Sequence, residues 1–83
     1  MTIHVRLFAI VRERARAAEV ELPLGESATV ADAVAALAGR FPAVKDFLPR
    51  CAFAVNQDYV PATTVLRDGD ELAVIPPVSG GRR

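Results

Sequence analysis

Hydrophobic and polar residues alternate near the start of the chain and predict two short strands. Residues 3–7 are alternately apolar and polar, which is the period-two pattern of a strand that buries one face. Residues 19–22 alternate in the same way and stop at Pro23. The intervening segment 10–17 is rich in helix-forming residues but barely two turns long, so only packing can hold it as a helix.

A longer helix is predicted from Thr29 to Gly39. Thr29 and Asp32 have the spacing of a capping box, and apolar residues then recur at three- and four-residue intervals along one face. Gly39 stands where a left-handed C-terminal cap is expected, and Pro42 prevents the helix from continuing. The pattern therefore indicates a helix with one apolar face that ends between residues 38 and 40.

The second half of the chain predicts further strands separated by turns. A continuous apolar run at residues 51–55 is typical of a well-buried strand, and residues 59–60 and 65–66 are weaker strand fragments. Residues 68–70 have the composition of a turn. Residues 71–75 then predict a closing strand.

This order of elements predicts an α+β domain over residues 1–77. One main helix would cover one face of a mixed sheet, and the first and last strands would lie side by side and parallel at its centre. A β-grasp arrangement fits this order. The opposite face of the sheet would carry Phe8 and stay partly open to a partner, and residues 78–83 would form a flexible tail.

Composition narrows the function classes. The chain has 83 residues, 52% of them hydrophobic, which indicates one compact globular domain. The charges of ten basic and ten acidic residues cancel, so the net charge gives no indication of nucleic-acid or membrane binding. The longest apolar run, residues 33–38, is far shorter than the roughly 18 residues that cross a bilayer, and no signal peptide is recognisable. We therefore expect a cytoplasmic protein.

No group of side chains has the pattern of an enzyme active site or a metal site. Cys51 lies in an apolar run, where a small buried hydrophobe is expected rather than a nucleophile. Asp68 and Asp70 flank a glycine, which is typical of a turn whose carboxylates bind nearby amides. His4 is expected at the surface, and we expect no bound metal or cofactor.

The last residues have properties that core packing does not explain. Pro76 and Pro77 stop the closing strand and keep the backbone extended. Ser79, Gly80 and Gly81 then remove all bulk, so that this segment is slender enough to enter a narrow channel. A frayed terminus has a similar composition, and composition alone leaves both interpretations open.

Four segments together resemble a known family. Residues 8–13, 54–57, 68–71 and 76–81 (Phe-Ala-Ile-Val-Arg-Glu, Ala-Val-Asn-Gln, Asp-Gly-Asp-Glu and Pro-Pro-Val-Ser-Gly-Gly) are similar to those of the MoaD-type sulfur carriers, the small subunits of molybdopterin synthase. The resemblance spans essentially the whole chain. It implies a ubiquitin-like β-grasp fold.

The resemblance also implies that the reactive group is the carboxylate of Gly81. In this family an E1-like enzyme adenylates the terminal glycine with ATP, and the adenylate is converted to a thiocarboxylate. The large synthase subunit receives the tail and passes the sulfur to precursor Z in molybdenum cofactor biosynthesis. The resemblance thus implies a carrier that is not catalytic alone, binds no cofactor and forms a heterotetramer with the large subunit.

Further site residues follow from the same resemblance. Gly80 is the slender neighbour that lets the tail enter the partner. Phe8, Tyr59 and Ile75 match positions where the family presents apolar surface to the large subunit, although ordinary sheet packing is the alternative for each. The partner-binding residues implied in this way are Phe8, Tyr59, Ile75, Pro76, Pro77, Val78 and Ser79.

The chain departs from the family after Gly81, because Arg82 and Arg83 follow it. An internal glycine has no free carboxylate and cannot be adenylated. Proteolytic removal of the two arginines, residues added in cloning, and a paralogue that no longer carries sulfur are three explanations. We favour the first two, since the glycine-bearing tail otherwise has no evident use.

Proteins with other functions share this fold, and three such functions are alternatives for this chain. A carrier for thiamine or cysteine synthesis would have the same Gly-Gly end, although the Pro-Pro-Val-Ser sequence before it favours the molybdopterin branch. A ubiquitin-like modifier would be joined through Gly81 to lysines of other proteins. A non-catalytic interaction domain would retain Arg82 and Arg83.

Overall fold

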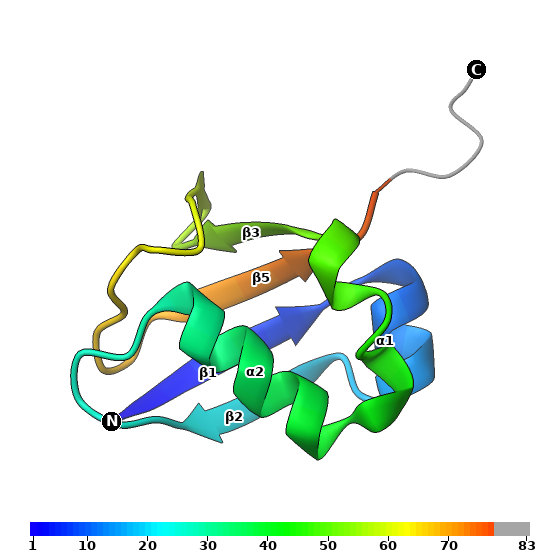
Figure 1. Cartoon of the computed structure of the whole chain (residues 1–83), viewed down its shortest axis with the longest axis horizontal. Coiled ribbons are helices and arrows are strands. Elements are labelled where there is room, and N and C mark those ends of the chain that lie inside the picture. Colours follow the sequence, from blue (N-terminus) through cyan, green and yellow to red (C-terminus); the bar gives the residue numbers. More distant parts are fainter. Residues whose placement is uncertain (78–83) are drawn as a thin grey trace.

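The computed structural model describes residues 1–77 and shows one mixed sheet. Its strands are β1 (Thr2–Leu7), β2 (Glu19–Pro23), β3 (Ala52–Val55), β4 (Asp58–Tyr59) and β5 (Glu71–Ile75). The strand order is β2-β1-β5-β3-β4 (Figure 1). The central strands β1 and β5 are parallel, as the sequence predicts, and the other neighbours are antiparallel.

One face of the sheet is covered by helix α2 (Val30–Arg40) and forms the core (Figure 1). Ile3, Val5 and Leu7 of β1 point to this face and are almost fully buried. Leu72 and Val74 of β5 lie opposite Val5 and Leu7 in the parallel register and are buried with them. Alternation along the strands therefore leaves the other face for polar and partly exposed residues.

Helix α1 (Ala9–Ala15) connects β1 to its antiparallel neighbour β2. It is short, and its exposed face carries Arg12 and Arg14. Val11 is fully buried and ties the helix to the core. Packing thus holds a helix that its length alone would not stabilise, as expected.

The start of α2 is a complete capping box. The Thr29 hydroxyl accepts a hydrogen bond from the Asp32 amide at 3.3 Å, and the Asp32 carboxylate accepts one from the Thr29 amide at 2.9 Å. Aspartate thus replaces the usual glutamate or glutamine of this motif. Ala33 and Leu37 on the following turns are buried, which confirms the predicted apolar face.

We expect Thr29→Ala to lower the free energy of unfolding by about 1 kcal/mol, because the Asp32 amide at the start of the helix loses its acceptor, the Thr29 hydroxyl. Urea denaturation measures this change. Thr63 is exposed, and its side chain makes no hydrogen bond within residues 1–77, so Thr63→Ala is the matched control. An equal loss of stability in the two variants would contradict a capping role for Thr29.

The predicted end of α2 is wrong in one respect. Gly39 does not form a left-handed cap but lies inside the helix, which continues through Arg40 to a cap at Phe41. The Arg40 guanidinium donates a hydrogen bond from Nη1 to the Glu21 carbonyl at 2.9 Å, so the last turn is anchored on β2. Pro42 then disfavours a helical conformation at Phe41 and ends the helix.

Strand β3 is less buried than its apolar sequence predicts. Cys51 precedes the strand, Ala52 is exposed, and only Ala54 is buried. The reason is position, since β3 is the second strand from one edge. Phe53 borders an open groove beside α2, and Ala52, which lies opposite Ile75 in the register, points to the uncovered face of the sheet. Residues 65–66 are not a strand either, because Val65 makes only an isolated bridge to Thr29.

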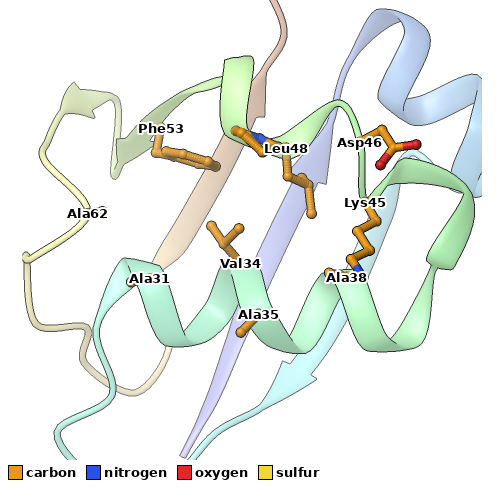
Figure 2. A pocket seen from close by; sticks show the side chains of 10 residues that line it. Ala31, Val34, Ala35, Ala38, Lys45, Asp46, Leu48, Phe53 and Ala62 are labelled. Carbon is orange, nitrogen blue, oxygen red and sulfur yellow. The ribbon is translucent and has the colours of Figure 1, made fainter.

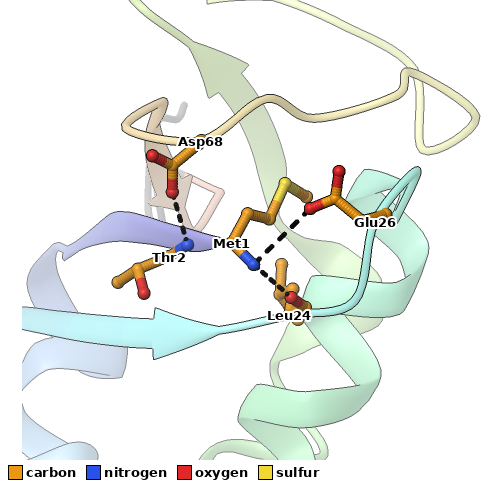
Figure 3. A network of polar contacts seen from close by, with 5 residues as sticks. All are labelled: Met1, Thr2, Leu24, Glu26 and Asp68. Atoms are coloured by element: carbon orange, nitrogen blue, oxygen red, sulfur yellow. Dashed lines mark hydrogen bonds and ion pairs between the residues drawn. The ribbon is translucent and has the colours of Figure 1, made fainter.

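The turn before β5 has the structure that its sequence predicts. The Asp68 carboxylate accepts a hydrogen bond from the Thr2 amide at 2.8 Å (Figure 3), and Asp70 accepts one from the Arg67 amide at 2.8 Å. Gly69 between them has φ +84°, a conformation that favours glycine. The two carboxylates therefore organise the backbone and position the start of β5 beside β1.

Candidate functional site

The predicted reactive tail begins where β5 ends. Ile75 is the last residue of this central strand, and it is followed by half-buried Pro76 and exposed Pro77. The chain therefore leaves from the middle of the sheet (Figure 1). The remaining predicted site residues, Val78, Ser79, Gly80 and Gly81, lie outside the described residues, as does the predicted tail boundary at residue 78.

Residues of β5, β3 and β4 form a surface on the face opposite α2. Ala73 lies opposite Ala54 in the register, and Ala54 lies opposite Tyr59, so their side chains share this face. Ile75 is two residues beyond Ala73 and points the same way. Tyr59 and Ile75, far apart in the chain, are thus brought to the same side of the sheet.

Phe8 extends this surface at the end of β1. The Arg6 side chain lies on the same side as Ala73, its partner in the parallel register, and its guanidinium stacks over the Phe8 ring at 5.3 Å. Phe8 follows the strand in an extended conformation and is half-buried. We call this surface the open face; it comprises Arg6, Phe8, Ala52, Tyr59, Ala73 and Ile75.

Among the residues of the open face, Tyr59 is the one whose position is least explained by packing within the domain. Its side chain is 72% exposed, although it lies on a paired strand. It is held there by a tight hairpin turn in which Asn56 and Gln57 have φ values of +50° and +75°. The Asn56 side chain also donates to Asp70 and accepts from the Glu71 amide, both at 3.0 Å, which fixes the hairpin to β5.

Cys51 and His4 have environments that do not favour catalysis. Burial raises the pKa of the Cys51 thiol, so the nucleophilic thiolate is disfavoured, and its Sγ donates to the Phe47 carbonyl at 3.3 Å. His4 is at the surface, 3.8 Å from the Glu21 carboxylate. His4 thus lies at the surface as expected, whereas Cys51, which was expected to be buried, is only half-buried.

Within the part of the chain that the structure describes, no three His, Cys, Asp or Glu side chains gather as metal ligands would. Over the same residues, no helix combines the length and the apolar character that a membrane span requires.

An apolar groove that was not predicted from the sequence lies between α2 and β3 (Figure 2). Its volume is about 600 Å³. Val34 and Ala38 of α2 form one wall, and Leu48 and Phe53 form the other. The signal in the sequence is a second row of small apolar residues on α2, but the facing wall comes from a distant segment that no local pattern reveals.

A second groove, which the sequence also did not predict, lies beside Pro76 and Pro77 where the tail begins. Its volume is about 480 Å³, and it combines residues from α1, the single-turn helix η2 (Leu48–Arg50) and the end of β5. We call it the tail-base groove; its lining residues are Ala9, Ile10, Glu13, Phe47, Arg50, Pro76 and Pro77.

The sheet topology, the single covering helix and the exit of the chain from the central strand define a ubiquitin-like β-grasp protein, as expected. Comparison with known families agrees, since the sequence profile of the ThiS family matches residues 5–81. The chain belongs to the ThiS family. The matched region ends at Gly81, so Arg82 and Arg83 fall outside it.

Individual relatives agree with this assignment. The chain is 42% identical over 83 residues to the molybdopterin synthase sulfur carrier subunit of Chlamydomonas reinhardtii, covering 98% of this chain and 100% of the relative. The solved structure of SAMP1 from Haloferax volcanii has a TM-score of 0.91 at 31% identity, covering 98% and 100% of the two chains. The family resemblance deduced from the sequence is therefore confirmed.

A third similar structure is a complex. The protein–protein complex of subunits 1 and 2 of the molybdopterin-converting factor from Helicobacter pylori contains a chain with a TM-score of 0.72 at 27% identity to this one. The alignment covers 98% of this chain and 100% of that one. That relative is thus known with a second subunit.

Proposed function

We propose that this chain is the small sulfur-carrier subunit of molybdopterin synthase, and that its reactive group is the C-terminal carboxylate of Gly81. The observation that carries the proposal is the full-length similarity to a molybdopterin synthase sulfur carrier subunit. The position of β5 supports it, because the chain reaches Pro76 and Pro77 directly from the end of a central strand of the sheet. The carrier is not catalytic on its own.

The chemistry follows from the weakness of a carboxylate as an electrophile. An E1-like enzyme uses ATP to convert the Gly81 carboxylate to an acyl adenylate and releases pyrophosphate. A sulfur donor then displaces AMP, which leaves a thiocarboxylate. This step requires a free carboxylate at Gly81, so Arg82 and Arg83 must first be absent or removed. Because adenylation of the Gly81 carboxylate consumes ATP, we place this step, and the carrier, in the cytoplasm.

The large subunit is the proposed acceptor of the charged tail. It would take up Val78, Ser79, Gly80 and Gly81 and transfer the sulfur to precursor Z, with two copies of each subunit forming a heterotetramer. The open face supports this docking, because Phe8, Tyr59 and Ile75 present apolar surface on one side of the β5 terminus. Aromatic and aliphatic anchors of this kind often carry most of an interface's binding energy.

Protein modification is the second candidate function. The observation that favours it is the similarity to SAMP1, which is a small archaeal modifier protein. A modifier would be joined through Gly81 to lysines of other proteins, whereas a carrier would return unconjugated after each sulfur transfer. The thiamine and cysteine carriers remain alternatives for the pathway that receives the sulfur.

Intact mass measurement of the carrier recovered from its own cells tests the proposal. A thiocarboxylate replaces one oxygen of the Gly81 carboxylate with sulfur, which changes the mass of the free chain. Covalent conjugates to lysines, without any free thiocarboxylate, would instead support the modifier.

A further inference from the structure

At the end of the molecule where the tail begins, four arginines outnumber two nearby carboxylates, those of Glu13 in α1 and Glu19 at the start of β2. Helix α1, which carries Arg12 and Arg14 and is followed by Arg16, lies at this end (Figure 1). Arg50 of η2 lines the groove beside Pro76 and Pro77, and all four arginines are exposed. Within residues 1–77, none of these four side chains forms an ion pair. Their charges are therefore available to a partner at the surface.

The opposite end of the central strands is acidic. Asp68 and Asp70 lie in the turn before β5, and Asp58 lies beside it across the Asn56 hairpin. The formal net charge of the chain is +0, so the positive excess at one end is balanced elsewhere. Such a separation of charge orients and accelerates the approach of a partner with a negative surface to the tail end.

The tail-base groove provides a binding surface at this positive end. Ile10, Phe47 and Pro76 make it apolar, and Arg50 adds a cation to its lining. The Arg14 guanidinium stacks over the Phe47 ring at 5.5 Å, which places a second cation beside the groove. Glu13 is the one carboxylate among the lining residues. Arginine and aromatic side chains are enriched where interfaces bind most strongly.

We propose that the tail-base groove is a second docking surface for the large subunit, which places there an apolar side chain flanked by carboxylates. The inference rests on the proposed function, because a partner that takes up the tail must pass Pro76 and Pro77, and both line the groove. The open face begins at Ile75, directly before these prolines. The large subunit therefore contacts the end of β5 through two surfaces, the open face and the tail-base groove with its neighbouring arginines.

Charge reversal at Arg50 tests this surface. Stopped-flow measurement of association with the purified large subunit should show Arg50→Glu about tenfold slower than the unmodified carrier at low salt, with a weaker dependence on salt. Arg67→Glu is the matched control, because it changes the net charge equally but lies in the turn at the acidic end. We expect Arg67→Glu to change the association rate less than about twofold.

Equal association rates for Arg50→Glu and Arg67→Glu would overturn the inference. Phe8→Asp, on the open face, separates this failure from failure of the proposed function. If Phe8→Asp weakens binding and Arg50→Glu does not, the groove assignment alone is wrong. If the large subunit fails to bind the unmodified carrier, the proposed function fails as well; if it binds the unmodified carrier and all of these variants equally, neither surface is the docking surface.

Discussion

A carrier that ends at residue 81 and has Gly81 replaced by alanine should fold normally and transfer sulfur about a hundredfold more slowly. The reacting atoms are carried by residue 81 itself, so a Cβ there adds bulk beside the reaction centre and narrows the accessible backbone conformations. Displacement of a reacting group by about 1 Å is enough for a loss of this size. Single-turnover conversion of precursor Z by the loaded carrier and the large subunit measures the rate.

Gly25→Ala is the matched control for this variant. Gly25 is exposed, and a Cβ built on it meets no atom within 4 Å, so the substitution should leave both stability and transfer unchanged. Thermal unfolding of the two variants checks that each is folded. If Gly81→Ala unfolds normally and transfers sulfur at the original rate, the reaction does not depend on that residue.

The second large effect is expected at the open face. Phe8→Asp and Ile75→Asp should each weaken binding to the large subunit by about 2–4 kcal/mol, because each places a carboxylate in an interface that excludes water. The smaller of these values corresponds to a roughly 30-fold higher Kd. Both side chains are half-buried in the free carrier, so some loss of stability is also expected. Isothermal titration calorimetry measures the affinity.

Val65→Asp controls for the introduction of a charge at an apolar position. Val65 is 58% exposed and makes its bridge to Thr29, outside the open face. Its replacement should leave the affinity unchanged. Affinities that are equal for Phe8→Asp, Ile75→Asp and Val65→Asp, in variants that all unfold cooperatively, would show that the open face is not the docking surface.

Much of the fold could be predicted from local patterns, since one-sided burial leaves a clear trace in the sequence. The alternation at residues 3–7, 19–22 and 71–75 is the direct result of burial against α2, and all three segments are strands. The start of α2 was equally predictable, because the hydrogen bonds between Thr29 and Asp32 involve residues only three positions apart.

Where the sequence prediction was wrong, distant contacts decide the structure. Gly39 remains helical because the last turn is anchored through Arg40 to Glu21, which lies 19 residues earlier. The apolar run at residues 51–55 is only partly buried, because its position near the edge of the sheet depends on the whole strand order. Neither the hydrogen bond between Arg40 and Glu21 nor the order of the strands leaves a signal in the neighbouring sequence.

The candidate site, like the fold, could be predicted from the sequence only in part. Phe8, Tyr59 and Ile75 were proposed from family resemblance, and the structure adds that they share one face of the sheet. The tail-base groove was not predicted, since Ile10, Phe47 and Pro76 come from three separate segments. A groove assembled from such distant residues becomes visible only in the folded chain.

Intact mass spectrometry of the protein isolated from its own cells determines whether Gly81 is the terminal residue and carries sulfur. We expect molecules that end at Gly81, without Arg82 and Arg83, and a fraction in which one oxygen of the terminal carboxylate is replaced by sulfur. Retention of both arginines on every molecule, with no modification at Gly81, would contradict this expectation. That result would identify the chain as a β-grasp protein that does not carry sulfur.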